Sequence, residues 1–472
     1  MIFNSLTFLI FFTIVVCVYY LPWTWTQRKV FLLLASYVFY AAWNPPFVLL
    51  LMASTVIDWM VAQRMAATAH PTRRRALLIV SLVFNLGVLA FFKYGGFLLD
   101  NFIRLAAALG VHYQPSSWDI VLPIGISFYT FMTLSYTIDV YRRRIEPGNS
   151  FLDYALFITF FPHLVAGPIL RAADFLPQCT TPRRATLDQF GWGLTLMAVG
   201  LFEKVVLADS ITAPVADMVF RAVDRAGFID AWVGTLAFSA QIFFDFAGYS
   251  TCAIGAALCL GFVLKGNFRY PYAAVGFSDF WQRWHISLSS WLRDYLYFPL
   301  GGNRHGQWTT VRNLMLTMLL GGLWHGASWR FVAWGGLHGS YLVAERVAKQ
   351  RFADVAWLAT AAARVGLAML TFALVSVAWV FFRAVSFRDA AQLLRVMAVG
   401  GDDRLDLGVN NVVYVAGITA VLLGVHWWMR DSSLEVRWSA IPWWARSAVL
   451  ATILLSLALV PGDDRAFIYF QF

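Results

Sequence analysis

The sequence predicts an all-α integral membrane protein that crosses the bilayer many times. Of its 472 residues, 60% are hydrophobic and only 13% are charged, whereas an ordinary soluble domain carries about 25% charged residues. Apolar runs of about 20 residues recur along the chain, and each is long enough to cross the hydrocarbon core of a bilayer. The runs are continuous rather than alternating, so helices and not a closed barrel must satisfy the backbone in lipid. We expect roughly ten to twelve transmembrane helices of this length, with additional re-entrant or interfacial helices, in one membrane-embedded domain over residues 1–472.

The positions of the basic residues explain the formal net charge of +10 without a nucleic-acid partner. The residues gather in short loops beside apolar runs, as in the arginine triplets at residues 73–75 and 142–144. An excess of Lys and Arg in such loops is typical of the cytoplasmic side. We therefore expect both triplets to face the cytoplasm, and we expect no binding of nucleic acid.

The cysteines indicate neither a disulfide framework nor a zinc site, because no C-x-x-C pair occurs. We therefore expect no metal centre. The four cysteines are Cys17, Cys179, Cys252 and Cys259. The first apolar run, residues 2–21, has neither a preceding basic residue nor a small-residue cleavage signal, so we expect a retained first span rather than a signal peptide.

The order of the apolar runs predicts the path of the chain. Arg28 and Lys29 follow the first run, so the N-terminus is expected outside. The string NPP at residues 44–46 divides the next region into two crossings joined by a tight turn. Further expected spans are residues 76–94, 120–140, 187–207, 231–264, 315–343, 365–382, 412–428 and 448–460, with residues 95–119 as an external segment.

Residues 151–170 form an apolar run that is poorly suited to one continuous crossing. The run contains Pro162, Gly167 and Pro168, and a basic stretch flanks each end. A full crossing would place one of these stretches outside, so we expect a re-entrant segment. Broken helices at membrane depth need shelter from protein or from a water-filled cavity. The segment is therefore a first indication of a cavity.

His325 is the leading candidate for chemistry, because ionisable residues inside membrane spans are costly and are functional candidates by default. It lies in the string LGGLWHGA between apolar stretches. An imidazole with an ordinary pKa of about 6.5 can accept a proton at neutral pH. Gly321, Gly322 and Gly326 would let a bulky substrate or another helix approach closely. The alternative is a histidine that only packs between helices.

His285 is the second candidate and lies in an aromatic and basic stretch, residues 267–307. Helical spacing predicts Trp281 and His285 on one face, with Arg283 on another. An aromatic, basic helix suits the cytoplasmic interface, where Trp anchors the chain and Arg reaches headgroups or phosphates. Simple interfacial anchoring explains most of the tryptophans, but it explains His285 less well.

Asp245 is the other polar residue of note inside an apolar run, in the string FFDFAGYS. It can orient a histidine, or it can pair with a buried Arg or Lys for structure, and the sequence favours neither. A serine hydrolase is poorly supported, because the chain has no G-x-S-x-G. The H-E-x-x-H, P-loop and G-x-G-x-x-G motifs are absent as well.

Several long strings resemble the membrane-bound O-acyltransferase superfamily, and within it the bacterial alginate O-acetyltransferase branch. The longest are NFRYPYAAVGFSDFWQRWHISLSSWLRDYLYFPLGGNR at residues 267–304 and GGLWHGASWRFVAWGGLHG at residues 321–339. FFPHLVAGPI from Phe160, FFDFAGYS from Phe243 and FIYFQF from Phe467 also match, in the expected order. The motif-bearing region spans about residues 151–345, and the N-terminal quarter of the chain matches only in hydropathy.

The resemblance implies roles for individual residues. His325 matches the histidine that the family treats as catalytic, and His285 matches the histidine of the RWHxS segment, on the cytoplasmic side of the same tunnel. Thr251 departs from the family, which often has an acidic residue after Gly-Tyr-Ser, so no acid acts at that position. The residues expected to support the histidines are Trp324, Trp281 and Asp245.

The resemblance also implies an enzyme that moves an acetyl group from cytoplasmic acetyl-CoA across the bacterial inner membrane, for O-acetylation of an extracytoplasmic polysaccharide. Acetyl-CoA is a substrate here, and no bound cofactor is expected. Arg283, Arg293 or Arg304 would contact its phosphates. Ion pairing with Asp279 or Asp294 is the structural alternative. Besides the lipid bilayer, a periplasmic acetyltransferase protein is an implied partner.

Two alternatives to this function remain at the level of sequence. The D-alanyl transferases of teichoic acid share the RWH and WHG strings, whereas PLGGNR and FIYFQF favour the branch that acetylates alginate, cellulose or peptidoglycan. A transporter or export pore without chemistry of its own is the second alternative. Transporters commonly show inverted repeats with paired broken segments, and only one clear broken segment precedes the motif region.

Overall fold

The structure is a computed structural model that describes residues 1–472 except 114, 116–119, 166, 353–354, 357–359, 402–406, 461–464, 466 and 471–472. Every regular element in those ranges is a helix. The chain forms two compact units, the first of Met1–Leu194 with Ala253–Lys265 and the second of Thr195–Cys252 with Gly266–Phe472. That the whole chain acts as one membrane domain stays a prediction.

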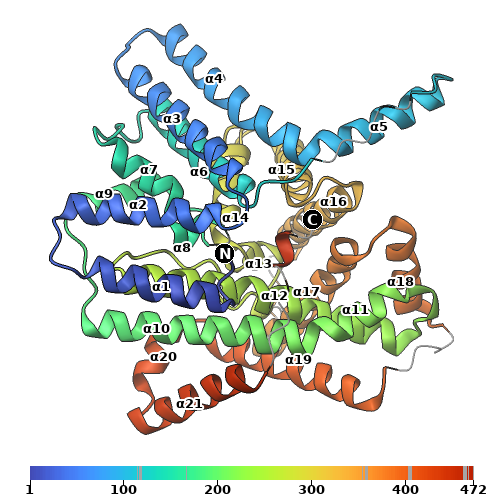
Figure 1. The fold of residues 1–472 in the computed structure, drawn as a ribbon. Helices are drawn as coiled ribbons and strands as arrows, with labels where there is room; N and C mark the ends of the chain where they lie inside the picture. Colours follow the sequence, from blue (N-terminus) through green and yellow to red (C-terminus); the bar gives the residue numbers. More distant parts are fainter. Residues whose placement is uncertain are drawn as a thin grey trace. The chain divides into compact units, whose positions relative to one another are not determined.

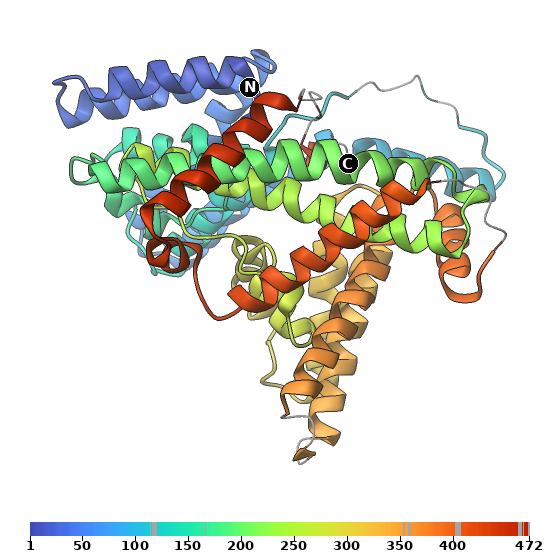
Figure 2. The ribbon, with the colours of Figure 1, turned by 90° about the horizontal axis from the view of Figure 1, so that it is seen from below.

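The first unit is built from helices joined by short turns that the local sequence sets. Thr24 and Gln27 form a capping box at the start of α2, and Pro46 opens α3 just after the predicted NPP turn. Figures 1 and 2 show α1 and α2 side by side. The helices of this unit are α1 (Leu6–Tyr19), α2 (Trp25–Ala41), α3 (Pro46–Ala66), α4 (Pro71–Leu89), η1 (Ala90–Tyr94), α5 (Gly95–Ala108), α6 (Ile126–Tyr141), α7 (Phe151–Thr159), α8 (Phe161–Leu164) and α9 (Ala172–Cys179).

The helix over the apolar run at residues 76–94 does not end at Tyr94 as expected, and the external placement of residues 95–119 stays a prediction. The π-helical turn η1 carries the helix on into α5, which continues to Ala108. The reason is that Leu98, Phe102 and Leu105 extend the apolar pattern, and all three are exposed on the surface of α5. The polar residues between them made this stretch resemble a loop in the sequence.

The two arginine triplets lie at the same end of the first unit. Arg74 is buried, and its guanidinium donates to the backbone oxygens of Val140 and Tyr141, at 2.9 Å in each case. These carbonyls belong to the last turn of α6, immediately before the second triplet. The positive-inside pattern requires the two loops to share one side of the membrane, and this contact places them together.

The stretch from α7 to α9 returns close to where it begins, and a re-entrant course of residues 151–170 in the membrane stays a prediction. Lys29 pairs with Asp153 at the start of α7 and also donates to the backbone oxygen of Cys179, at the end of α9. Between these contacts the helix breaks at Phe160, just before Pro162. The broken stretch is buried, which supplies the shelter that a broken helix needs at membrane depth.

The second unit carries both candidate histidines and the aromatic, basic stretch between them. A helix that begins in the first unit as α10 (Leu187–Leu201) leads into it. The helices that follow are η2 (Phe202–Thr212), α11 (Ala213–Arg221), η3 (Val223–Arg225), α12 (Phe228–Cys259), η4 (Pro271–Ala273), α13 (Phe277–Arg283), α14 (Ile286–Leu292), η5 (Arg293–Tyr297), α15 (Gln307–His325), α16 (Trp329–Arg351), α17 (Ala361–Arg383), α18 (Phe387–Val399), α19 (Val409–Met429), α20 (Leu434–Ala440), α21 (Trp443–Leu459) and η7 (Ile468–Phe470).

Helices α15 and α16 form a close pair, which Figure 2 shows as adjacent gold and orange helices. A Cβ atom added at Gly322 would lie 2.2 Å from the backbone oxygen of Phe331. One added at Gly335 would lie 2.2 Å from the backbone oxygen of Met318. No side chain fits at either position, so glycine allows the two backbones to approach. Of the three glycines near His325 that could allow a substrate or another helix to approach, Gly322 therefore allows the approach of helix α16.

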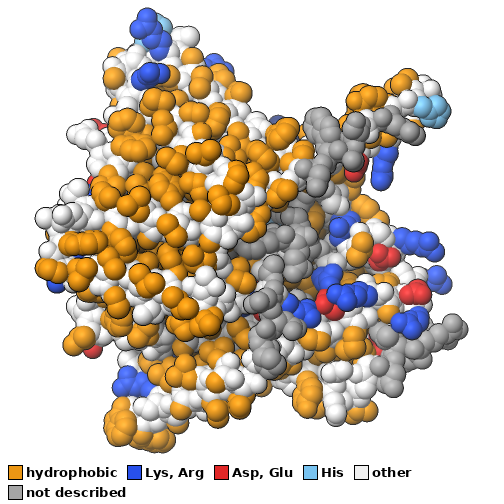
Figure 3. Space-filling model, in the orientation of Figure 1, with side chains coloured by type: hydrophobic (Ala, Val, Ile, Leu, Met, Phe, Trp, Pro, Cys, Tyr) orange, Lys and Arg blue, Asp and Glu red, His pale blue; other side chains and the backbone are white. Residues whose placement is uncertain are grey.

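Five helices in the described ranges are long and apolar enough to cross a membrane. They are Pro46–Ala66, Pro71–Ala108, Phe228–Cys259, Ala361–Arg383 and Val409–Met429, and the apolar helices α1 and α21 are shorter. Large hydrophobic side chains of α1 to α4 are exposed, and Figure 3 shows much of this face in orange. So much exposed apolar surface suits contact with lipid. The protein is therefore a multi-pass membrane protein.

Candidate functional site

His325 is the last residue of α15, and its imidazole lies in a buried aromatic cluster. The ring centroids of Trp334, Phe382 and Tyr469 lie 5.0, 5.7 and 5.4 Å from that of His325. His325 is 6% exposed, and Trp324, which precedes it, is half-buried. The imidazole is thus held by packing at the point where the helix ends and the chain changes direction.

His285 lies in the break between α13 and α14, where its φ is 42°. A left-handed φ is strained for a residue other than glycine, so the surrounding contacts must hold it. The backbone oxygen of His285 accepts a hydrogen bond from the N–H of Ser289 at 2.9 Å, and Nδ1 lies 3.2 Å from Oδ1 of Asn267. Burial lowers the pKa of His285 well below its ordinary value. The imidazole is therefore neutral at physiological pH.

The expectation that Trp281 and His285 share one helical face is wrong. Helix α13 ends at Arg283, and the left-handed turn at His285 redirects the chain. Trp281 instead packs against Trp334 and His338, with ring centroids 5.8 and 5.1 Å away. Trp281 therefore packs against the aromatic side chains of α16 and does not contact the imidazole of His285 as a helical neighbour.

The structure brings His285, from the break between α13 and α14, and His325, from the end of α15, close together, and they are hereafter the histidine pair. Their ring centroids lie 6.5 Å apart, with an angle of 53° between the rings. Phe246 of α12 packs edge-on against His285, with ring centroids 4.6 Å apart. The two imidazoles thus lie close enough to act on one bound substrate, and contacts such as that with Phe246 hold His285 in place.

Tyr469, close to the C-terminus, is a third side chain at this place, and the sequence analysis did not select it. Its ring centroid lies 5.4 Å from that of His325 and 4.7 Å from that of Phe246. Its hydroxyl is buried and has no hydrogen-bond partner among the residues that the structure describes. The string FIYFQF contains Tyr469 and could have indicated it, but the string supported only the family resemblance. The last two residues of the string lie outside the described ranges.

Asp245 anchors the C-terminal segment. One of its carboxylate oxygens pairs with Lys204, and the other accepts a hydrogen bond from the backbone N–H of Ile468 at 2.8 Å. Lys204 also pairs with Asp209 at 2.9 Å. Of the two interpretations of Asp245, pairing with a buried cation is the one that the structure shows. By fixing Ile468, Asp245 also sets the position of the next residue, Tyr469.

A cavity of about 880 Å³, hereafter the large cavity, lies among α13, α14, η5, α15 and α16. It reaches Ile286, the residue after His285, and its volume is typical of small-molecule and cofactor sites. The residues that line it are Ser278, Trp281, Gln282, Ile286, Ser289, Ser290, Leu292, Arg293, Tyr297, Leu314, Thr317, Met318, Leu342, Glu345, Arg346, Lys349 and Gln350.

The lining of the large cavity has more positive than negative charge. The lining contains three cations, Arg293, Arg346 and Lys349, and one carboxylate, that of Glu345. Glu345 pairs with Lys349. Of the arginines predicted to contact acetyl-CoA, Arg293 lines this cavity. Arg304 is exposed in the loop before α15 and lies outside the lining. Arg293 also pairs with Asp294 at 2.9 Å, which is the structural alternative predicted for it. The cavity lining thus contains one of the predicted arginines and two cations from α16.

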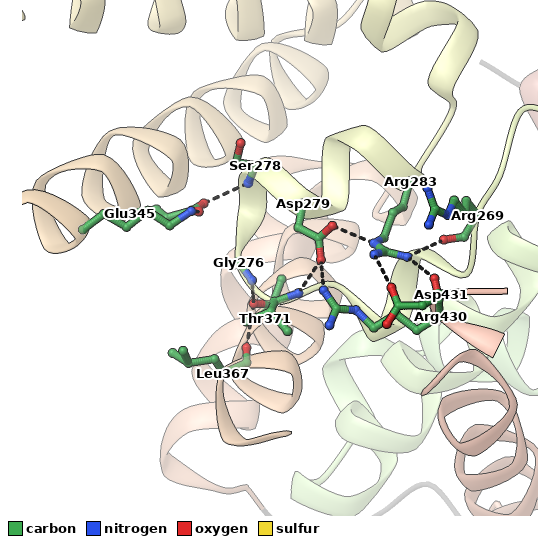
Figure 4. A network of polar contacts seen from close by, with 12 residues as sticks. Arg269, Gly276, Ser278, Asp279, Arg283, Glu345, Leu367, Thr371, Arg430 and Asp431 are labelled. Carbon is green, nitrogen blue, oxygen red and sulfur yellow. Dashed lines mark hydrogen bonds and ion pairs between the residues drawn. The ribbon is translucent and has the colours of Figure 1, made fainter. Parts of the chain in front are cut away.

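Arg283 belongs to a structural network around Asp279, which Figure 4 shows from close by. Its Nε donates to Asp279 at 2.7 Å, and its guanidinium also donates to the backbone oxygens of Arg269 and Arg430. Asp279 accepts further hydrogen bonds from the Val275 N–H and the Arg430 side chain. Burial raises the pKa of the Asp279 carboxyl, but these donors outweigh it and hold the pKa below its usual value. For Arg283, the structural alternative of pairing with Asp279 is therefore the one observed.

A second cavity of about 260 Å³, hereafter the small cavity, adjoins the C-terminal segment. Arg465 of that segment and Arg383 of α17 both pair with Asp217, which gives the segment another anchor besides Asp245. The residues that line the small cavity are Lys204, Asp209, Asp217, Arg221, Gln241, Asp245, Arg383, Arg465 and Ile468. The small cavity thus reaches Ile468, the residue before Tyr469, as the large cavity reaches Ile286, the residue after His285.

Known proteins resemble the chain over most of its length. Residues 130–384 match the model of the MBOAT, membrane-bound O-acyltransferase family. A protein named probable alginate O-acetylase AlgI from Pseudomonas putida is 38% identical, over 100% of this chain and 100% of its own length. The protein of the same name from Pseudomonas aeruginosa is 43% identical, over 84% of this chain and 75% of its own length. The peptidoglycan O-acetyltransferase of Helicobacter pylori is 38% identical, over 78% of this chain and 73% of its own length.

Proposed function

The chain belongs to the membrane-bound O-acyltransferase family, and we propose that it transfers an acetyl group from cytoplasmic acetyl-CoA to a hydroxyl group on the outer side of the bacterial inner membrane. Membership makes it an O-acyltransferase, and relatives named for alginate and for peptidoglycan both carry acetyl groups to a polymer. We propose alginate as the polymer, because an alginate relative matches over the full length of both chains.

The observation that carries the proposal is the histidine pair, with rings 6.5 Å apart, beside a cationic cavity of about 880 Å³. Acetyl-CoA bears its phosphates at the end remote from the thioester, and Arg and Lys pair with phosphate groups. Arg293, Arg346 and Lys349 would hold that end, and the thioester would extend toward the histidine pair. A cationic cavity that reaches the residue next to His285 suits a donor with phosphates at one end and a thioester at the other.

In the proposed reaction, the acceptor hydroxyl attacks the carbonyl carbon of the thioester. His325 accepts the hydroxyl proton as the new C–O bond forms, and the C–S bond then breaks. Coenzyme A leaves as a thiolate and takes the proton from the His325 imidazolium, so an ester and a thiol are the products. A positioned general base of this kind typically accelerates a reaction about 10²–10⁴-fold.

The small cavity supports a hydroxyl-bearing acceptor. Oδ2 of Asp209 and Oε1 of Gln241 are buried in its lining, and neither has a hydrogen-bond partner among the described residues. Both are acceptor oxygens, and hydroxyl groups are suitable donors to them. In this proposal the immediate acceptor is either the polymer itself or a hydroxyl of a periplasmic partner protein.

Sealed vesicles that contain the full-length protein provide the test. Acetyl-CoA labelled in its acetyl group is supplied at the cytoplasmic face, and alginate is supplied at the other face, with and without periplasmic extract. We expect labelled ester on the polymer and an equal amount of released coenzyme A thiol. If extract is required, the partner protein is the immediate acceptor. A transporter without chemistry would move label and release no thiol, and this result would overturn the proposal.

A further inference from the structure

Asn267, between α12 and η4, holds three successive residues at the strained turn of His285. Its backbone oxygen accepts a hydrogen bond from the N–H of Ile286 at 2.9 Å. Its side-chain Oδ1 lies 3.2 Å from Nδ1 of His285, 3.2 Å from the backbone N of Ser287 and 2.8 Å from the Ser287 hydroxyl. Asn267 is 1% exposed, so these contacts are not shared with bulk solvent.

The backbone N–H of Ser287 identifies which atom of the Asn267 amide faces it. An N–H group can only donate, so the facing atom must be the oxygen, because an amide NH₂ in that place would oppose donor to donor. The other end of the amide agrees, since Nδ2 donates to the hydroxyl of Ser250 at 3.2 Å. The oxygen of Asn267 is therefore fixed toward His285.

An amide oxygen can only accept hydrogen bonds, so the His285 nitrogen beside it must carry the hydrogen. A neutral imidazole carries one N–H, and its other nitrogen then holds a lone pair. With Nδ1 protonated, the lone pair of His285 resides on Nε2. Asn267 thus selects one of the two tautomers.

We propose that Asn267 is the positioning residue that fixes His285 in the Nδ1–H tautomer, so that Nε2 is the nitrogen that accepts a proton or a hydrogen bond during acetyl transfer. The inference rests on the proposed function for the role of His285. The tautomer itself follows from the hydrogen bonds alone, so it can be measured without any activity. Histidines at reactive sites depend on such a partner, because the wrong tautomer presents an N–H where a lone pair is needed.

The primary test is the ¹⁵N spectrum of the full-length protein labelled at histidine in lipid nanodiscs. Coupling of each ring nitrogen to the ring protons separates Nδ1–H from Nε2–H, and His285→Gln identifies the His285 signals by their loss. We expect the Nδ1–H form in the wild-type protein. A spectrum of the Nε2–H form would overturn the proposal, and this measurement requires no variant of Asn267 to fold.

Variants then distinguish control of the His285 tautomer from a role of Asn267 that only stabilises the turn. Asn267→Leu removes the acceptor, so we expect a mixture of tautomers, a fall in kcat of at most about tenfold, which is the effect expected of removing His285 itself, and a KM for acetyl-CoA close to that of the wild type. Asn267→Asp keeps an oxygen at the same place, so Nδ1 should keep its hydrogen. Ser287→Ala is the matched control, because it removes a donor to the same oxygen and leaves the His285 contact in place. It should keep both the tautomer and kcat.

The outcomes distinguish this inference from the proposed function. If folded Asn267→Leu protein keeps the pure Nδ1–H form, Asn267 only stabilises the turn at His285 and the inference fails. If its tautomers mix but kcat is unchanged, the tautomer has no part in the reaction and the inference again fails, while acetyl transfer by the enzyme stands. If the wild-type protein transfers no acetyl group at all, the proposed function fails, and the assigned role of Asn267 in transfer fails with it.

Discussion

His325 and His338 lie on neighbouring helices, and both pack against the same indole ring. The centroid of Trp334 lies 5.0 Å from that of His325 and 4.8 Å from that of His338. Both histidines are buried, and both are followed by glycine in the motif strings WHG and LHG. Burial, aromatic packing and a glycine neighbour therefore do not distinguish them.

The rest of their surroundings does distinguish them. The ring centroids of Phe280 and Trp281 lie 5.9 and 5.1 Å from that of His338. The ring nitrogens of His338 have no hydrogen-bond partner within the described ranges. His325 faces a second histidine and a tyrosine from the C-terminal segment. The two histidines therefore differ in having or lacking titratable neighbours from distant parts of the chain, and not in burial, and this difference is what the proposed catalytic role of His325 rests on.

The largest expected effect is that of His325→Gln. Glutamine can hydrogen-bond but is not a base near neutral pH, so we expect acetyl transfer to fall about 10²–10⁴-fold while the protein inserts and folds normally. The measurement is acetyl transfer per amount of folded protein in the membrane. If His325 only packs, as His338 does, the variant should keep most of its activity. That outcome would end the catalytic role and the comparison together.

A smaller loss is expected from His285→Ala, because His325 is the base that takes the hydroxyl proton, whereas Nε2 of His285 assists it by accepting a hydrogen bond or a relayed proton. We expect roughly a tenfold fall in kcat, which corresponds to about 1.4 kcal/mol of lost transition-state stabilisation. Combining His285→Ala with His325→Gln tests whether the pair acts as one relay. If it does, the double variant should lose no more activity than His325→Gln alone. Full activity of folded His285→Ala protein would contradict any role for His285.

Substitutions in the large cavity should act on donor binding and not on the chemical step. We expect Arg346→Gln and Lys349→Gln each to raise the KM for acetyl-CoA about three- to tenfold with little change in kcat, because each removes one contact worth about 1 kcal/mol in both ground and transition states. Arg304→Gln is the matched control, because Arg304 is exposed outside the cavity. An unchanged KM after combined substitution of Arg293, Arg346 and Lys349 would rule out the donor site.

Much of the fold was predictable because lipid imposes a simple rule on the sequence. Long apolar runs must be helical, and basic loops must share a side, so the NPP turn and the common end of the arginine triplets were both expected from composition and order. The continuation of the helix through η1 into α5 was not expected. Helix propensity is a weak signal, and the scattered polar residues of α5 concealed its apolar face.

The site was predictable only in part, because local patterns do not encode contacts between distant residues. His285 and His325 were selected by residue type and resemblance, and the structure places them together. Tyr469 and Asn267 were missed, since nothing within a helical turn of either residue points to a histidine. Arg346 was missed for a simpler reason, because it lies just beyond the apolar run at residues 315–343 and is therefore not a charge inside a predicted span.

The smallest expected effect is that of His338→Gln, the matched counterpart of His325→Gln. Both variants place the same side chain beside Trp334, on neighbouring helices. The introduced amide at position 338 would be buried among rings without a partner, so we expect a loss of about 1–3 kcal/mol in folding stability. Acetyl transfer per amount of folded protein should stay close to that of the wild type, because His338 does not face the histidine pair. Thermal unfolding of purified protein and the vesicle assay measure the two quantities separately. If folded His338→Gln protein loses as much activity as His325→Gln, the line drawn between a packing and a reactive histidine is wrong, and Trp334 would have to be regarded as part of a larger reactive cluster.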